Sequence, residues 1–419
     1  MAHLANEPAP KTFQFQILST AHAGEIEETV ADALAAINET RPELRERHIS
    51  PILSDSKAVK NLLSTDNGKN IFHKLRTISP KTMVNLKKVT LNGFDLSGVN
   101  LRDANVYWSK LRGVNLRESD LRGAYMFHCH CHDSIFDYAK LSMGSGGKRT
   151  TLAMAHLVRA KMIGADLSFA DIIDSSLQEA TLDRAILNGT LIAGSVLTRA
   201  SLKAVTSSRE YPPVFMINSI VSYADLTDAK LPKIIMRRAI IANADLTRTD
   251  LSDADLQSAD LRCSKFHYTN LTRANLSSAM LNFCDLRTAI LLGADLTDTG
   301  LLGVNLENAD LRGTILTYVR ADAANLSGAN MPAVNMQFAA MNGTNLEGAN
   351  LTGAFMRNTA LVGANLSGAS LAGASLRSAD LANANLEGAD LTNADLRGAI
   401  LTGTKLKNAK TDGTILSRR

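Results

Sequence analysis

The chain has 419 residues, with 45 Lys and Arg against 41 Asp and Glu and a formal net charge of +4. The charge counts to −1 over residues 1–80, +5 over 81–215 and zero over 216–419. This even balance excludes the clustered basic surface expected of a protein that binds nucleic acid directly. Four Cys residues without paired spacing exclude a disulfide framework, and no apolar run reaches the roughly 18 residues of a transmembrane segment.

The N-terminal sequence MAHLANEPAPKTFQFQ does not combine a basic start with an apolar core. A cleavable secretory signal is therefore not expected. We expect the chain to be synthesised as a reduced, cytoplasmic protein.

Residues 1–80 differ in pattern from the rest of the chain and are expected to form a small α+β head domain. Alternating apolar residues predict a strand over 13–17, and apolar residues at helical spacing predict a helix over 26–37. A shorter helix is expected after Asp55, with Val59 on its buried side. Capping of the first coil of a solenoid is the simplest role for this domain, because an uncapped coil exposes its core and its unpaired edges.

Residues 81–419 follow a five-residue frame. Between Met216 and Leu406, 29 of the 39 central positions are Leu, and the position two residues earlier is mostly Ala. Neither a helix nor a strand keeps every fifth residue on one face, so the chain must turn once per repeat. Frequent Gly two residues after the centre, as at Gly328, suits the positive φ of a type II turn.

This A-(N/D)-L-x-x repeat resembles the pentapeptide-repeat family. The resemblance implies an all-β solenoid, a right-handed quadrilateral β-helix with 20 residues per coil whose central Leu and preceding Ala fill the interior. Earlier repeats run from Leu86 to Leu141 and from Leu152 to Leu202. The breaks between the blocks, at about 142–150 and 203–215, are expected to be surface loops, since they hold a Gly cluster and a Pro pair.

The run HCHCH at residues 128–132 has the ligand types that zinc prefers. The frame makes Cys131 a centre and Cys129 its small inward partner, whereas the three His residues fall on outward positions. Thiols and imidazoles that face opposite ways cannot bind one ion together, so no metal is expected here. The segment GSGGKRTT differs from a phosphate-binding loop, because Ser142 replaces the first Gly and Arg149 follows the Lys. No catalytic residue and no cofactor are expected.

A spacing of 20 places residues on neighbouring coils and predicts an aromatic patch on the outer surface. Its members are Tyr107, Trp108, Phe127, His128, Lys87 and Lys88. Exposed aromatic residues beside basic ones are typical of interfaces. The patch is covered either by the head domain or the 142–150 loop, or by an external protein partner; the sequence leaves both open. A further row of Asn residues at the same spacing, Asn305 to Asn385, is expected to form a structural ladder.

The sequence favours a non-enzymatic scaffold for protein–protein interaction. A short head followed by repeats resembles certain bacterial effectors that are delivered into host cells without a cleaved signal. The alternative is a relative of the DNA-mimicking proteins that protect gyrase from quinolones, which depend on an acidic surface; here residues 216–419 have 19 acidic and 19 basic side chains. A third class, an enzyme that recognises substrates through its repeats as some bacterial ubiquitin ligases do, would need a catalytic domain for which the chain has no room.

Overall fold

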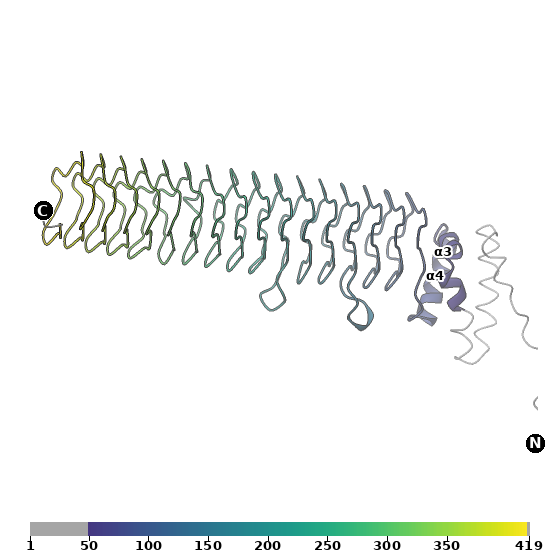
Figure 1. The fold of residues 1–419 in the computed structure, drawn as a ribbon. Coiled ribbons are helices and arrows are strands. Elements are labelled where there is room, and N and C mark those ends of the chain that lie inside the picture. The colour runs from purple at the N-terminus through teal and green to yellow at the C-terminus, as the bar shows by residue number, and fades with distance from the viewer. Residues whose placement is uncertain (1–48, 417–419) are drawn as a thin grey trace, which may run out of the picture.

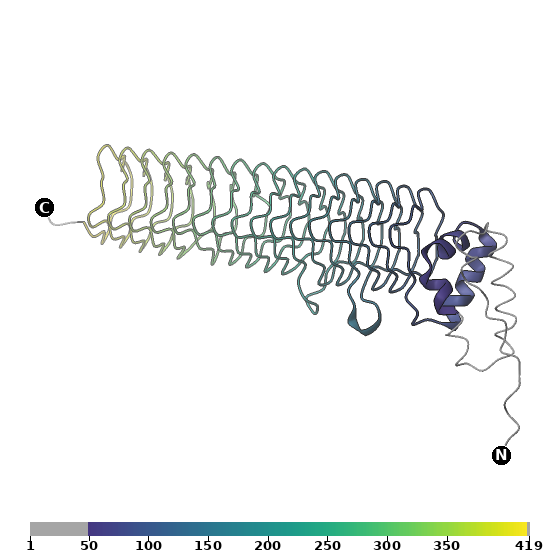
Figure 2. The same cartoon turned by 45° about the vertical axis from the view of Figure 1, so that its right-hand side comes forward.

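A computed structural model describes residues 49–416. They form a long rod of stacked coils with helices at its N-terminal end, and two loops leave the rod on one side (Figures 1 and 2). The strand expected over 13–17 and the helix expected over 26–37 lie outside the described residues.

The described part of the head is helical. Residues 49–54 are followed by α3 (Ser56–Leu62) and α4 (Asp66–Ile78). Asp55 and Thr65 cap the two helices, because their side-chain oxygens accept hydrogen bonds from backbone N–H groups of the first turn. Apolar side chains of both helices belong to the same buried core as the first coils: Ala58, Val59, Leu62, Ile71, Phe72 and Leu75.

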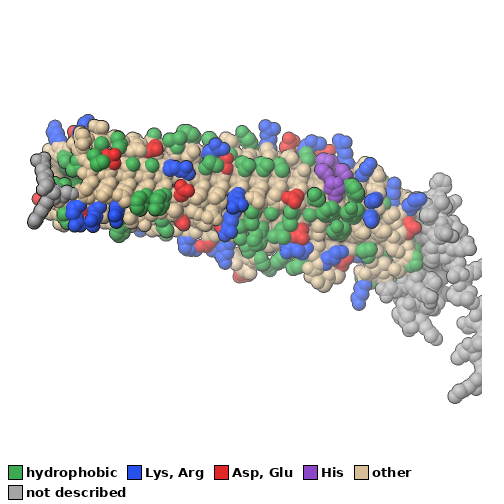
Figure 3. Space-filling model, viewed as in Figure 1, with side chains coloured by type: hydrophobic (Ala, Val, Ile, Leu, Met, Phe, Trp, Pro, Cys, Tyr) green, Lys and Arg blue, Asp and Glu red, His purple; other side chains and the backbone are tan. Residues whose placement is uncertain are grey.

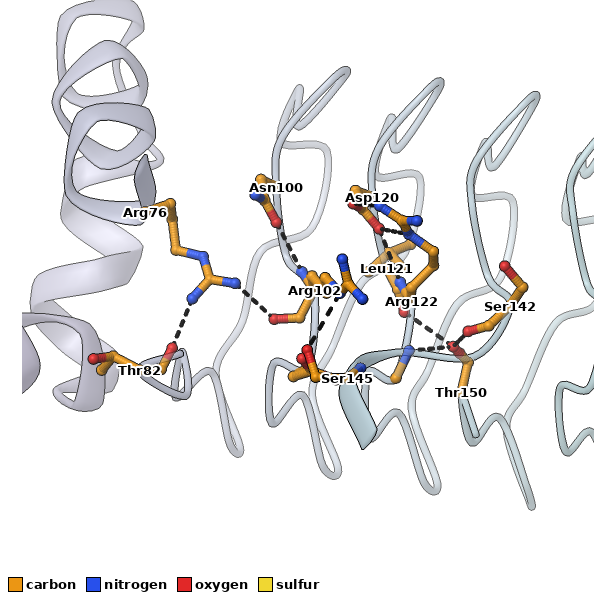
Figure 4. A network of polar contacts seen from close by, with 12 residues as sticks. Arg76, Thr82, Asn100, Arg102, Asp120, Leu121, Arg122, Ser142, Ser145 and Thr150 are labelled. Atoms are coloured by element: carbon orange, nitrogen blue, oxygen red, sulfur yellow. Dashed lines mark hydrogen bonds and ion pairs between the residues drawn. The ribbon is translucent and has the colours of Figure 1, made fainter. Parts of the chain in front are cut away.

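Arg76 joins α4 to the rod. Its side chain is only 2% exposed, and its guanidinium donates to the carbonyl oxygens of Thr82 at 2.6 Å and Arg102 at 2.8 Å (Figure 4). Burial lowers the pKa of this group. The backbone N–H of Asn85 also donates to the Leu53 carbonyl at 2.9 Å. The helices therefore cover the open end of the first coil.

The described part of the rod has isolated parallel bridges in place of extended strands. These bridges start at Asn85–Asn105, end at Asp395–Ile415 and recur every five residues, with one gap where Ile290 and Asp310 do not pair. Outside the loops each bridge joins residues 20 apart. A coil therefore has four sides, with one bridge position on each side. The central residues and their small partners point inward and are buried along the rod as far as Leu396, whereas the centre Leu406 in the last coil is 41% exposed. The buried side chains form one continuous core.

Outside the loops each described repeat, except the one with its corner at Thr288, ends in a turn whose second corner residue has positive φ. The backbone N–H of Ala104, for example, donates to the Leu101 carbonyl at 3.0 Å. Gly328 takes φ +66° at this corner, as the sequence predicts, but Trp108 and His128 take +54° and +56° at equivalent corners. Glycine is thus favoured there and not required, because the hydrogen bonds of both neighbouring coils fix the backbone.

The first loop lies within 142–150 and contains the 3₁₀ turn η2 (Ser145–Gly147). Tyr125 pairs with Thr151, 26 residues later, so this coil has six extra residues. The hydroxyl of Thr150 is buried and donates to the Ser142 carbonyl at 2.7 Å, which closes the loop (Figure 4).

The second loop is shorter than the predicted 203–215. Leu191 pairs with Phe215, which leaves only four extra residues, and Thr206 still pairs with the coils on both sides. The predicted loop was too long because position 207 is an inward centre, at which the frame predicts Leu. The residue there is Ser207, which is only 9% exposed.

The predicted row of Asn residues forms a ladder. The Nδ2 group of each member after the first donates to Oδ1 of the member one coil earlier, over 3.1–3.2 Å. The members are Asn305, Asn325, Asn345, Asn365 and Asn385. The ladder accounts for these amides structurally.

Candidate functional site

The aromatic patch lies on the rod near its helical end. The rings of Tyr107 and Phe127 are nearly parallel, with centroids 6.0 Å apart. Tyr125 lies parallel to both rings, with its centroid 6.0 Å from each. The three rings thus form a rigid stacked surface, in which each aromatic side chain holds the others in place.

Lysine and imidazole groups border this stack. The ammonium group of Lys87 lies 5.3 Å from the centre of the Tyr107 ring, and that of Lys88 lies 5.5 Å from the Trp108 ring. The indole of Trp108 packs edge-on against the His128 ring at 5.3 Å. The structure therefore brings all six members of the aromatic patch together, and four of them form two cation–π contacts.

Tyr125 was not among the patch residues predicted from the sequence. Its position directly precedes a centre, and it pairs with Asn105 on the neighbouring coil, diagonal to Tyr107. A spacing of 20 does not find diagonal neighbours, although such pairs are within reach of aromatic side chains on adjacent strands. A search at spacings of 18 and 22 would have found Tyr125.

The patch is open within residues 49–416. Trp108 is 45% exposed and Tyr125 is 37% exposed. The first loop does not cover them, because it packs at the neighbouring corner, where the Ser145 N–H donates to the Asp103 carboxylate at 3.2 Å. The described helices contact the end of the rod, as Arg76 does.

The run at 128–132 divides between the interior and the surface. Cys129 and Cys131 are fully buried. The Cys129 thiol donates to the Val106 carbonyl at 2.8 Å, as the Ser134 hydroxyl does to Leu111 at 2.5 Å one repeat later. The two thiols thus have the role of small inward residues, and neither joins the imidazoles outside.

The imidazoles gather on the surface together with a residue that the sequence analysis missed. His156 pairs with His130, and their rings stack with centroids 4.8 Å apart. His132 also stacks on His156, at 5.6 Å. His156 was missed because the six extra residues of the first loop place it 26 residues after His130; the loop length added to 20 would have predicted the contact.

A surface pocket of about 340 Å³ lies further along the rod. Its lining contains two guanidinium groups and no carboxylate, thiol or imidazole: Ile217, Arg237, Arg238, Gln257 and Ser258. This set does not offer the paired acid and base that hydrolytic or proton-transfer chemistry needs. None of the helices in the described range is long and apolar enough to span a membrane.

A family profile described as "Pentapeptide repeats" matches residues 84–117 and, in successive overlapping matches, residues 222–368 and 369–408. These matches cover more than half of the chain. The chain belongs to the pentapeptide-repeat family. The membership predicted from the five-residue frame is thereby confirmed, and the protein is a solenoid scaffold. No curated protein matches the chain significantly.

Solved pentapeptide-repeat structures are similar to this one. HetL, involved in heterocyst differentiation regulation in the cyanobacterium Nostoc sp. strain PCC 7120, is 28% identical, with 62% of this chain and 89% of HetL covered and a TM-score of 0.17. QnrB1, a plasmid-mediated fluoroquinolone resistance protein, is 17% identical, with 50% and 92% covered and a TM-score of 0.27. Rfr23 from the cyanobacterium Cyanothece 51142 is 22% identical, with 36% and 87% covered and a TM-score of 0.18. With TM-scores this low, the likenesses carry no argument about what this pentapeptide-repeat protein binds.

Proposed function

We propose that this protein is a non-enzymatic scaffold that binds a protein partner through the aromatic patch. The observation that supports this most is the stack of Tyr107, Tyr125 and Phe127 beside the 45% exposed Trp108. Tyr and Trp are enriched at the centres of protein interfaces, where they provide most of the binding free energy.

The partner is expected to present apolar side chains flanked by carboxylates. The stacked rings offer an apolar surface, and Lys87 and Lys88 provide positive charge at its border. Because the rings are already held by one another and by the rod, little side-chain entropy is lost on binding.

The charge pattern argues against the alternative, a DNA mimic that binds gyrase. Acidic groups of the rod lie close to basic ones, as Asp228 does to Arg248 and Asp253 to Arg273. Figure 3 shows red and blue side chains interspersed along the visible face. Such pairing leaves no continuous acidic stripe to replace a DNA backbone on that face.

Delivery into a host cell, which the layout of head and repeats suggests, stays a prediction. A fusion of the full chain to a translocation reporter, expressed in a bacterium with a specialised secretion system during contact with host cells, tests it. A reporter signal that requires an intact secretion system would support delivery, and a signal equal to that of a secretion-deficient strain would contradict it.

Site-specific photocrosslinking tests the binding surface. The photoreactive residue p-benzoylphenylalanine replaces Trp108 in one variant and Phe338 in a control. Phe338 is a matched control because it is equally exposed, at 45%, and its ring stacks on Tyr318 with centroids 5.0 Å apart. We expect a discrete protein adduct at position 108 only, suppressed by an excess of unlabelled wild-type protein. The same adducts at both positions, or none at 108, would contradict the proposal.

A further inference from the structure

Three imidazoles from two coils converge on the outer surface of the rod. His128 and His130 belong to one coil and His156 to the next, and one ring nitrogen of each lies within 4.8 Å of those of the other two. Figure 3 shows histidine side chains gathered at one place on this face, toward the helical end.

The backbone holds this cluster in position. His130 and His156 occupy paired bridge positions, and the His156 N–H donates to the Cys129 carbonyl at 2.8 Å. His128 projects from the corner two residues earlier, where φ is +56°. Its ring lies 5.9 Å from that of His130 and 5.4 Å from that of His156, so the three rings border one small volume.

The nitrogen atoms of the cluster are suited to coordination. Nδ1 of His128 is buried and makes no hydrogen bond within the described structure, although an unpaired buried nitrogen is costly. A neutral imidazole is the form that binds metal ions.

We propose that His128, His130 and His156 bind one divalent transition-metal ion of the zinc class. Imidazole ligands suit Zn²⁺, Cu²⁺ and Ni²⁺, whereas Mg²⁺ and Ca²⁺ prefer oxygen. Three His ligands leave the fourth position of a tetrahedral ion open to water or to a side chain from another molecule. Around such an ion the ligand nitrogens lie about 3.4 Å apart when each bond is about 2.0–2.1 Å, so the rings need only small rotations inward.

This proposal revises the expectation that residues 128–132 hold no metal. The expectation was based on the opposite directions of thiols and imidazoles, and that division is present. It did not include His156, which supplies the third ligand from the next coil. Lys110 lies beside His130 on the neighbouring coil, where the two backbones form a β-bridge. Its positive charge repels a bound cation, so Lys110→Glu is expected to strengthen metal binding. The inference is independent of any partner of the aromatic patch.

Titration of the full-length, tag-free protein with Co²⁺ and Zn²⁺ tests the site. Calorimetry gives affinity and stoichiometry, and the visible absorption of bound Co²⁺ reports its coordination. We expect one ion per chain and a tetrahedral Co²⁺ spectrum that Zn²⁺ abolishes. The double variant His130→Ala/His156→Ala should lose this binding, whereas His267→Ala, which removes a distant imidazole, should retain it.

A second variant keeps the test decisive if the double variant fails to fold. His128→Asn removes one ligand at a corner where Asn tolerates positive φ, and should weaken binding more than about tenfold, since even residues that only orient metal ligands contribute about that much. Phe338→Ala, which removes an exposed ring that stacks on Tyr318 and not on the His cluster, should leave Co²⁺ binding unchanged. No stoichiometric binding by the wild type, or equal binding by the wild type and a folded His128 or His130/His156 variant, would overturn the proposal.

Discussion

The indole of Trp108 packs edge-on against the imidazole of His128, with ring centroids 5.3 Å apart. The two residues occupy the same turn corner on consecutive coils, with φ of +54° and +56°. His128 therefore touches both the aromatic rings and the His cluster. A partner that binds the aromatic patch would lie beside the open coordination position proposed for the metal.

The four Cys residues should differ sharply in reactivity. Cys129, Cys131 and Cys284 are buried, whereas Cys263 is exposed. Burial raises the pKa of Cys284 to about 12, and the hydrogen bond with Cys129, together with burial, raises that of Cys131. Because the thiolate is the reactive form, a thiol reagent should modify one group per native chain and four after denaturation. Fast modification of more than one native thiol would contradict the inward assignment.

Asp253 should stabilise the rod in a pH-dependent way. It pairs with Arg273 at 2.7 Å and with Arg209, and these partners lower its pKa to about 2. Since the carboxyl group of an unfolded chain titrates near about 3.9, the stabilisation is fully present above that pH and is lost as the pH falls toward 2. Asp253→Asn should therefore lower the melting temperature at pH 7 and have little effect at pH 2.

Asp174→Asn is the matched control for this variant. Asp174 occupies the same kind of corner, with φ +53°, and has no ion pair among the described residues. It therefore isolates the effect of placing Asn at positive φ. An equal change in melting temperature for both variants at pH 7 would show that the ion pairs of Asp253 contribute nothing.

Substitution of Leu346 should strongly reduce the stability of the rod, whereas substitution of its neighbour Glu347 should have little effect. Leu346 is fully buried, whereas Glu347 is exposed. Replacing a buried Leu by Ala already costs about 2–5 kcal/mol, and Leu346→Asp adds an unpaired buried carboxylate. Its urea midpoint should fall well below that of the wild type, whereas Glu347→Ala should stay within about 0.5 kcal/mol. Equal midpoints would contradict the assignment of the repeat interior.

The repeat frame predicts most of the rod, because Leu at each centre and Ala two residues earlier are set by the narrow interior. The frame failed where an inward centre is polar, as at Ser207, since the backbone of the coil is maintained by its neighbours and not by the local side chain. Residues 1–80 have no comparable repetition, and the contact of Arg76 with the first coil depends on tertiary packing.

The candidate sites were predictable only in part. A spacing of 20 placed Tyr107 over Phe127, but the diagonal contact of Tyr125 depends on the direction of side chains across adjacent coils. The contact of His130 with His156 depends on the number of residues in the first loop. The sequence pattern of a single coil predicts neither the Tyr125 contact nor the His130–His156 contact, because both form between neighbouring coils.

The variant Trp108→Gly should weaken partner binding without lowering the stability of the fold. Gly removes the strain of an L-residue at positive φ, which stabilises the folded state by roughly 1–2 kcal/mol. Gly also increases the conformational entropy of the unfolded chain, which destabilises the folded state by about 0.5–1 kcal/mol. The melting temperature should therefore be unchanged or slightly raised. The loss of an exposed aromatic anchor should cost about 2 kcal/mol or more of binding free energy.

The most direct test of the proposed function is the affinity of Trp108→Gly for the protein crosslinked at position 108, measured beside Phe338→Gly. Both substitutions replace a 45% exposed aromatic residue at positive φ. We predict about thirtyfold weaker binding for Trp108→Gly and wild-type affinity for Phe338→Gly, with both proteins as stable as the wild type. Equal affinities for the two variants would contradict this prediction.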